Sequence, residues 1–488
     1  MIDIIKNNMA PIMFGGLILF MLIGYPAAFS LAAVGMIFGY AAISMGLFQP
    51  DFFGNMTYQL YSIISNDLLL AIPFFTLMGA ILERCGLAED LLEGFGQLFG
   101  SLRGGLSYAV IIVGAVLGAI TGTVAASVIA MGVISLPVML KYGYSVRHTT
   151  GVIAASGTIT QLVPPSLVLV VMADVMGKSV GDMYKGAIGP SIIQIALFLL
   201  YVFALTFIKP KEVPALPPEA RILRGWPLVL KCTKGMVPSL VLIFLVLGTI
   251  FTGLATPTEA GAMGVVGAFA LAAINRRLTW DLTWQGMDST MRLTAMVAFI
   301  LIGARLFSLV FQGVGGGHWI EGMLANLPGG QLGFLVVVNL FVFVLAFFLD
   351  FFEIAFIVIP LLVPVATKLG IDLIWLGVLL CANMQTSFMH PPFGFALFYL
   401  RGISPPSIKS TDIYLGAIPW LFLQLALVAI LIVWPGSVTY WLDSGTQLNQ
   451  QQVDDALKNI IIPGLGGPSS PGGLPGFPGL EPPPLRIQ

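Results

Sequence analysis

The sequence predicts an all-α polytopic membrane protein made of two internal repeats, each with a re-entrant helical hairpin and a broken helix. Of its 488 residues, 57% are hydrophobic and only 9% are charged, whereas soluble domains carry about 25% charged residues. Apolar runs of the length that crosses a bilayer, about 17–25 residues, recur along the chain. Two interrupted runs also share one spacing of proline, lysine and glycine.

The apolar runs give the expected spans in chain order. The first run, 10–46, is divided by Gly24-Tyr25-Pro26 because proline interrupts a helix. Segment 89–102 is amphipathic and is expected to lie along the membrane interface. The other expected spans lie near residues 67–84, 105–140, 148–177, 186–208, 236–254, 257–275, 291–312, 331–349, 353–367, 372–400 and 411–435.

Charge and composition predict the orientation and the domain limits. Lys and Arg are concentrated in two loops, 209–234 and 276–292. Two spans separate these loops, so both lie on one side, and the positive-inside rule makes that side cytoplasmic. We expect a transmembrane domain over residues 1–436. Residues 437–488 are polar and then rich in proline and glycine, a composition that predicts a disordered tail.

One motif, P-x3-K-x-G-x20-P-P, occurs at residues 137–165 and again at 364–392. The copies define two repeats, at about 10–208 and 236–436. The apolar run before each copy predicts a hairpin, with one tip at Thr121-Gly122-Thr123 and the other at Asp350-Phe351. The helix that ends at each proline pair is expected to break near the midplane, where free N–H groups and carbonyls bind ions. Two ordinary proline-kinked helices are the alternative.

Ionisable residues within the predicted spans are costly there, which makes them candidates for function. Asp350 and Glu353 share one helix face and form either a cation or proton site or a solvated hairpin mouth. Arg305 either binds a substrate carboxylate, pairs with Asp350 or Glu353, or reaches the outer interface; we favour an ion pair. His390 is either a substrate donor or proton shuttle or a satisfied polar group.

Several function classes lack sequence support. No basic tract predicts binding of nucleic acid. The three cysteines and three histidines have no metal-ligand spacing, so no metal enzyme is expected. The segment 176–179 ends like a nucleotide-binding loop but lacks its first glycine, and no catalytic signature occurs.

Several segments together resemble the large membrane (M) subunit of tripartite ATP-independent periplasmic (TRAP) transporters. They are GAITGTVAAS (118–127), SGTITQLVPPS (156–166), TPTEAGAMG (256–264), FFLDFFEIAFIVIPLLVPVA (347–366) and NMQTSFMHPPFG (383–394). The last two segments are most similar to the subgroup labelled for mannitol, chloroaromatic or 2-oxo acid uptake. The resemblance covers residues of about 10 to 435.

The resemblance implies an elevator-type fold, like that of the ion transporter superfamily, in a bacterial inner membrane. It implies sodium-coupled import of organic anions, with Na+ as the coupling ion and no other cofactor. The implied partners are a small four-helix membrane subunit and a periplasmic solute-binding protein.

The family holds sodium largely through backbone carbonyls at the hairpin tips and helix breaks. Carried over by motif, the sodium-binding residues are Thr121, Gly122, Thr123, Gly157, Thr158, Pro164, Asp350, Met384, Thr386 and Pro391. The substrate-binding residues are then expected to be Thr160, Ser166, Asn383, Gln385, His390, Gly394 and Arg305.

The chain departs from the family at both tips. The common Ser-Gly-Ser-Ser pattern is replaced by 121-TGTV-124, and Asp-Pro-Thr is replaced by 350-DFF-352. Bulky Phe351, Phe352 and Phe393 indicate a more apolar substrate than a small dicarboxylate. Two other functions stay open: a stand-alone proton-coupled organic-anion carrier that uses Asp350, Glu353 and His390, and a membrane-embedded enzyme.

Overall fold

The protein is helical throughout the part of the chain that the structure describes. This computed structural model describes residue 6 and residues 8–221, 225–324, 327–347, 349–392 and 394–442. Eight helices are long and apolar enough to cross a membrane, or up to nine if one bent helix pair forms a single span. The predicted all-α polytopic fold is therefore confirmed. Phe393 and tail residues 443–488 lie outside the described residues.

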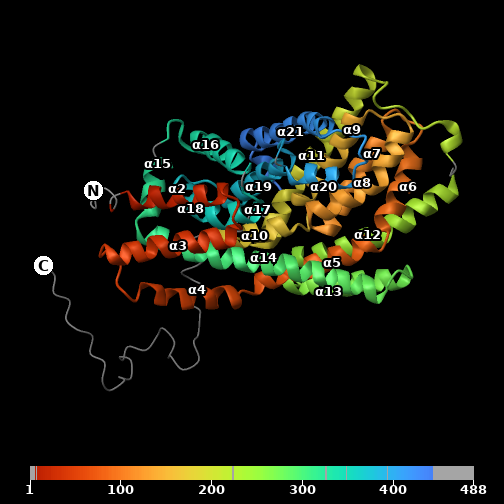
Figure 1. Cartoon of the computed structure of the whole chain (residues 1–488). Coiled ribbons are helices and arrows are strands. Elements are labelled where there is room, and N and C mark those ends of the chain that lie inside the picture. The colour runs from red at the N-terminus through yellow and green to blue at the C-terminus, as the bar shows by residue number, and fades with distance from the viewer. Residues whose placement is uncertain are drawn as a thin grey trace, which may run out of the picture. The chain divides into compact units, whose positions relative to one another are not determined.

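One group of helices, here called the scaffold, consists of the long helix α14, the helices that pack on it, and further helices that pack on those. The scaffold helices are α2 (Met9–Leu22), α3 (Ala27–Ser44), α4 (Asn55–Ile64), α5 (Asp67–Arg84), α12 (Trp226–Phe251), α13 (Pro257–Ile274) and α14 (Trp280–Gly313). Helix α14 lies beside α3 and α5, and α13 lies beside α5 (Figure 1). Glycine allows the α3–α14 approach, because a Cβ on Gly303 would lie 2.4 Å from the Ala28 carbonyl oxygen.

The scaffold matches the expected runs except at one helix. The first run is divided as predicted: α2 ends at Leu22, and α3 begins after Pro26. Helix α4 was not predicted. It joins α5 at a 47° bend, and its Tyr58 and Tyr61 are exposed. Polar residues interrupt its apolar residues, so the segment was not recognised as a span.

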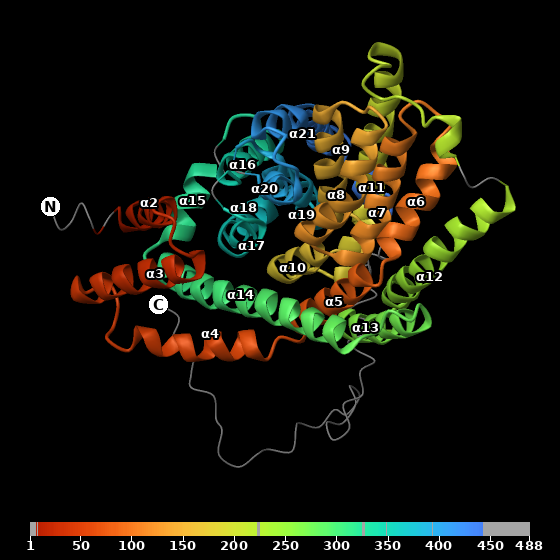
Figure 2. The ribbon, with the colours of Figure 1, turned by 45° about the vertical axis from the view of Figure 1, so that its right-hand side comes forward.

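The remaining helices form two copies of one unit, which we call the repeat core (Figure 2). Short helices α6 (Leu87–Phe99) and α15 (Gly316–Leu324) precede the copies. The first copy contains α7 (Gly105–Thr121), α8 (Val124–Lys141), α9 (Val146–Thr158), α10 (Leu167–Met176) and α11 (Val180–Ile208). The second contains α16 (Gly330–Leu345), α17 (Phe351–Glu353), α18 (Ile359–Lys368), α19 (Leu373–Met384), α20 (Phe395–Ile403), α21 (Ser410–Val433) and the terminal turn α22 (Gly436–Thr439).

Each copy holds a hairpin followed by a broken helix. Helices α7 and α8 form the first hairpin, and α16 with α17 and α18 forms the second. A π-helical stretch, Ile354–Val358, interrupts the second hairpin between α17 and α18. The broken helices are α9–α10 and α19–α20, and a proline pair with a cis peptide bond lies in each break. The predicted hairpins and breaks are confirmed.

The two broken helices run antiparallel and cross near their breaks. Helix α10, the second half of the first broken helix, packs against α19, the first half of the second. Reciprocally, α9 packs against α20 and against the turn that follows α19. Likewise, α20 packs on hairpin arm α8, and α10 packs on hairpin arm α18. This reciprocal pattern is that of inverted repeats, whose breaks meet at one place.

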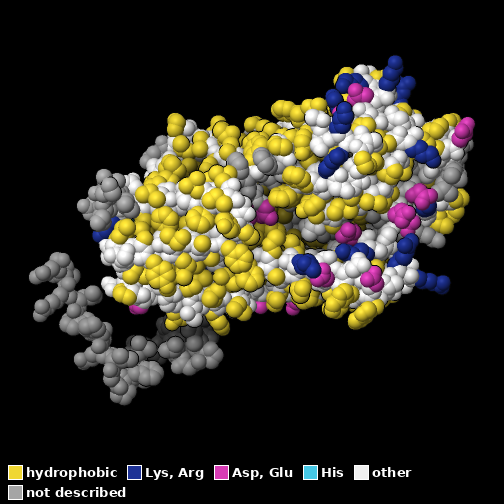
Figure 3. All heavy atoms as spheres, in the orientation of Figure 1, with side chains coloured by type: hydrophobic (Ala, Val, Ile, Leu, Met, Phe, Trp, Pro, Cys, Tyr) yellow, Lys and Arg dark blue, Asp and Glu magenta, His cyan; other side chains and the backbone are white. Residues whose placement is uncertain are grey.

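Most of the Lys and Arg side chains that are visible on one face of the protein lie at one end (Figure 3). In Figure 3, Lys and Arg cluster where α6, α7 and α12 lie, while the opposite part presents a broad hydrophobic surface. This distribution is the one that the positive-inside rule requires for a cytoplasmic end.

Candidate functional site

The two hairpin tips and the two helix breaks border one cavity of about 330 Å³. Two residues of scaffold helix α14 close one wall. The lining residues are Gly122, Thr123, Val124, Ala125, Gln161, Leu167, Val168, Leu293, Met296, Asp350, Phe351, Phe352, Phe388, Phe395 and Tyr399. We call this space the tip cavity.

The first tip ends in an uncapped helix. Gly122 ends α7 with φ +63°, in the left-handed region where glycine is favoured. Thr123 is extended at the N-cap of α8, and its side chain makes no capping hydrogen bond. The first-turn N–H groups of a helix have no partner within the helix and carry partial positive charge. The start of α8 therefore offers an anion site to the tip cavity.

The second tip is capped by its own carboxylates. Asp350 Oδ1 accepts hydrogen bonds from the N–H groups of Phe352 at 2.7 Å and Glu353 at 3.3 Å. Glu353 Oε2 accepts one from the Asp350 N–H at 3.1 Å. This reciprocal capping box stabilises the start of α17 and occupies the donors that an anion would use. The two acids thus have a structural task at this tip.

The first break has partners for the hydroxyl groups of Thr158, Thr160 and Ser166 but not for all of its carbonyls. Thr158 and Thr160 each donate to a carbonyl three residues earlier, at 2.8 and 3.0 Å. Ser166 donates to the Gln161 carbonyl at 2.7 Å and caps α10 through the Val168 N–H. Among the described residues, no hydrogen bond reaches the carbonyls of 163–165. Those oxygens are available to a cation.

Close packing holds the first tip against the first break. A Cβ on Gly118 of α7 would lie 3.0 Å from the Thr160 Cα, and one on Gly157 would lie 2.3 Å from Val128 Cγ2. Both positions therefore require glycine. Pro164 lies in this same break. The side chain of Thr121 is outside what the structure describes.

The second break is more enclosed. Asn383 donates to the Asn339 carbonyl, and Thr386 donates to the Asn383 carbonyl, both at 2.7 Å. Met384 and Gln385 are fully buried, and neither amide atom of Gln385 has a partner among the described residues. Gly394 donates to the His390 carbonyl at 2.6 Å. As in the first break, no hydrogen bond within the described chain reaches the carbonyls of 391–392.

His390 lies in an aromatic enclosure outside the lining of the tip cavity. Its ring centroid is 4.3 Å from that of Phe343 and 4.2 Å from that of Phe347. The side chain is 1% exposed, and neither ring nitrogen has a hydrogen-bond partner among the described residues. The geometry therefore supports neither a substrate donor nor a satisfied polar group.

Arg305 is placed differently from the favoured prediction. It is exposed on α14 and forms no ion pair with any described residue, so the expected pairing with Asp350 or Glu353 is wrong. It lies nine residues beyond Met296, the last cavity residue of α14, which is about 14 Å along a helix axis. Its side chain is not part of the tip cavity.

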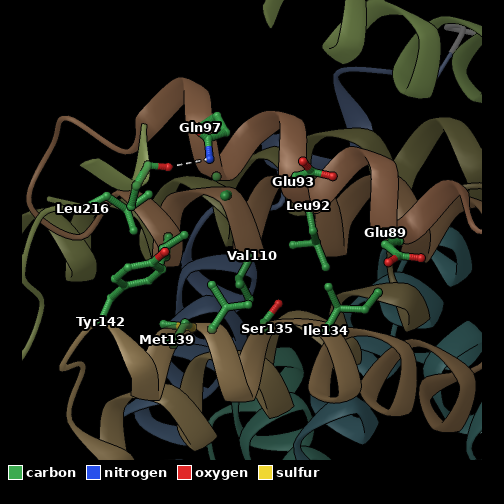
Figure 4. Close-up of a pocket in the computed structure, with 15 residues that line it drawn as sticks. Glu89, Leu92, Glu93, Gln97, Val110, Ile134, Ser135, Met139, Tyr142 and Leu216 are labelled. Carbon is green, nitrogen blue, oxygen red and sulfur yellow. Dashed lines mark hydrogen bonds between the residues drawn. The ribbon is translucent and has the colours of Figure 1, made fainter. Parts of the chain in front are cut away.

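A second cleft, of about 260 Å³, lies between α6 and the arms of the first hairpin (Figure 4). Glu89 and Glu93 are at its rim, and Glu93 forms an ion pair with Lys231. Gln97 donates to the Ala220 carbonyl at 3.0 Å (Figure 4). The two carboxylates at this cleft would repel an organic anion, so the cleft is poorly suited to bind one.

Sequence reasoning found part of the tip cavity. Gly122, Thr123 and Asp350, which were predicted to bind sodium, line it, whereas none of the predicted substrate-binding residues is among its described lining residues. Gln161, the α14 residues and the aromatic side chains from 388–399 were missed as site residues. Gln161 had a signal, since it is the amide in SGTITQLVPPS. The aromatic residues had none, because apolar residues are common everywhere in this chain.

Comparison with known proteins decides the family. The model of the DctM component of the tripartite ATP-independent periplasmic transporters matches residues 14–437. The chain belongs to the DctM family. It is thus a TRAP transporter large permease subunit, a multi-pass inner-membrane protein and not an enzyme, as the sequence predicted.

Two curated relatives of this permease have names that give different substrates. A C4-dicarboxylate TRAP transporter large permease protein of Pseudomonas aeruginosa is 31% identical over 395 residues, covering 81% of this chain and 90% of that protein. A sialic acid TRAP transporter large permease protein of Vibrio cholerae is 29% identical, with 83% and 93% covered.

A solved structure supports the fold of this DctM-family permease. The YdaH transporter of Alcanivorax borkumensis matches with a TM-score of 0.58 at 15% identity, covering 80% of this chain and 90% of that one. At this identity the likeness concerns architecture alone.

Proposed function

We propose that this permease imports organic anions together with Na+, by a movement of the repeat core against the scaffold. A periplasmic binding protein delivers the anion, and a small membrane subunit completes the transporter. The observation that carries the proposal is the tip cavity, in which an uncapped helix start faces a space shared by both repeats.

Binding of the anion is supported by the partial positive charge at the start of α8. The start of α8 supplies N–H groups and a partial positive charge without a competing side-chain cap. The two relatives named above are permeases for C4-dicarboxylates and for sialic acid, both organic acids. These names agree with an anion at that helix start.

Binding of sodium is supported by backbone carbonyl groups in the two helix breaks. In both breaks, carbonyls beside the proline pair receive no hydrogen bond from the described residues. Unsatisfied carbonyls cost several kcal/mol each in hydrocarbon, and a cation compensates them. We therefore assign sodium to the breaks and the neighbouring tips, at the residues predicted from the motifs.

The driving force is sufficient without ATP. Moving one elementary charge across 100 mV releases about 2.3 kcal/mol. An importer that carries more sodium charges than substrate charges can therefore accumulate its anion.

The elevator movement is supported by the wall that closes the tip cavity. Within the described part of the chain, the scaffold contributes two residues there, and both, Leu293 and Met296, are apolar. An apolar contact contains no hydrogen bonds that would have to break during a movement, so the tips can slide along α14.

Proton coupling has weaker support. Asp350 and Glu353 form one capping box at the start of α17. His390 is enclosed by two phenylalanine rings. None of the three forms a hydrogen-bonded chain with another that would carry a proton.

The test is uptake by the complete transporter in proteoliposomes, with sodium and proton gradients imposed separately. We expect uptake to follow the sodium gradient and to need the binding protein. Uptake that follows pH and ignores sodium would overturn the coupling. Uptake at full rate by this chain alone would overturn the dependence on partners.

A further inference from the structure

We infer that the anion of the tip cavity is a monocarboxylate with a flat apolar body, such as an arylalkanoate. The inference rests on the proposed function, because it names the substrate class of the same cavity. Three features of the lining carry it: one open anion site, one unpartnered amide and five aromatic rings.

The cavity has a place for one carboxylate. The start of α17 at its lining is capped by Asp350, and the start of α10 is capped by Ser166, whereas α8 begins without a side-chain cap. Among the described lining residues there is no Lys, Arg or His, and Asp350 is the sole charged one. A second carboxylate would find no cationic side chain there, and the N–H groups at the start of α17 are already bound by Asp350.

Side-chain size distinguishes α8 from the other uncapped helix start at the lining, that of α20. Helix α20 presents the rings of Phe395 and Tyr399 to the cavity. Helix α8 presents the smaller side chains of Val124 and Ala125 in its first turn. A carboxylate therefore has more room to reach the N–H groups of α8, and the α20 side of the cavity suits an apolar body.

Gln161 supplies a polar partner beside that place. It lines the cavity, its side chain is 6% exposed, and its Oε1 has no hydrogen-bond partner within the described chain. A buried polar atom of this kind is rare, because leaving it unpaired costs free energy. Its NH2 group is not among the fully buried atoms and donates no hydrogen bond within the described chain, so it is available to a carboxylate or to an adjacent keto oxygen.

The rest of the cavity fits an aromatic body. Phe351 and Phe352 form a T-shaped pair with ring centroids 5.2 Å apart, and Phe388 and Phe395 form a tilted pair at 6.2 Å. Tyr399 adds a fifth ring. Aromatic rings favour edge-to-face and offset contacts, so a ring inserted between these pairs is in contact on several sides. A dicarboxylate would bury its second charge against these rings without a hydrogen bond, which is unfavourable.

The test measures protection of a cysteine at the anion site. Ala125→Cys places a thiol on the first turn of α8, and the natural Cys85, Cys232 and Cys381 are buried. The full chain, purified with Na+, is labelled by a small maleimide in the presence of phenylacetate, succinate or 2-phenylethanol. We expect phenylacetate to slow labelling several-fold, and the other two to leave the rate unchanged.

A matched pair of variants locates the effect. Phe388→Ala, combined with Ala125→Cys, should weaken protection by phenylacetate. Phe203→Ala in the same combination should not, because Phe203 belongs to an exposed aromatic pair on α11 outside the cavity lining. Equal loss in both variants would overturn the aromatic assignment.

The outcomes separate this inference from the proposed function. Protection by succinate as strong as by phenylacetate, or none by phenylacetate, overturns the inference. Sodium-driven succinate uptake alongside that result would leave the proposed function standing. Protection by phenylacetate without sodium-driven uptake of any anion would support the ligand class and overturn sodium import.

Discussion

The two hairpin tips occupy equivalent places in the repeats but differ in chemistry. The first is small, turns at left-handed Gly122 and leaves the start of α8 uncapped. The second is aromatic, and Asp350 and Glu353 cap its helix start. In the binding mode that we propose, one tip offers hydrogen-bond donors to the anion, while the other offers ring faces to its body. The difference shows how two inverted repeats of the same architecture can bind the two different ends of an asymmetric substrate.

The largest expected effect comes from making the first tip like the second. Thr123→Asp places a carboxylate at the N-cap of α8, where Asp is a favoured residue that stabilises a helix by about 0.5–2 kcal/mol relative to alanine. The same carboxylate occupies the anion's donors, so transport should fall more than tenfold, or about 1.4 kcal/mol. Uptake and thermal stability are measured together, with Thr123→Ser as the control. Retained uptake would mean that the anion binds elsewhere.

The next effect separates capping from charge at the second tip. Asp350→Ala removes the cap of α17 and should cost about 0.5–2 kcal/mol of stability. Asp350→Asn keeps a capping oxygen without the charge, so stability and transport should both stay near normal. Thermal unfolding and sodium-driven uptake check this. Loss of transport in the Asn variant with an intact fold would show that the carboxylate itself takes part.

A smaller effect tests the turn that the first tip alone uses. Gly122→Ala meets no atom within 4 Å, but its φ of +63° is unfavourable for an L-residue by about 1–2 kcal/mol. The melting temperature should therefore fall. Gly248→Ala in α12 is the control, because it also meets no atom and has no positive φ, and alanine favours a helix. A similar fall in both would refute the strain.

The smallest effect concerns a residue behind the second tip. His390→Phe preserves a ring between Phe343 and Phe347, so uptake and its dependence on pH should be unchanged. The measurement is sodium-driven uptake across a pH series. A shifted pH profile would revive the proton-coupled alternative.

The sequence by itself determined most of the helices, the repeats and the positions of the breaks. These follow from local rules: apolar length sets a span, the proline pairs at 164–165 and 391–392 end helices, and a repeated spacing marks a duplicated unit. The capping box of Asp350 and Glu353 was also readable, since Asp followed three residues later by Glu is a helix-start pattern.

Only the tertiary structure decided which polar residues face the tip cavity. His390 is enclosed by rings that lie more than forty residues earlier in the chain, and Arg305 lies too far along α14 to meet Asp350. Gln161 and Tyr399 share a cavity because the two broken helices cross antiparallel. The exposure of a side chain and its hydrogen-bond partners depend on contacts between segments that are distant in the sequence. In a chain with 57% hydrophobic residues, local composition does not distinguish a cavity wall from any other packed surface.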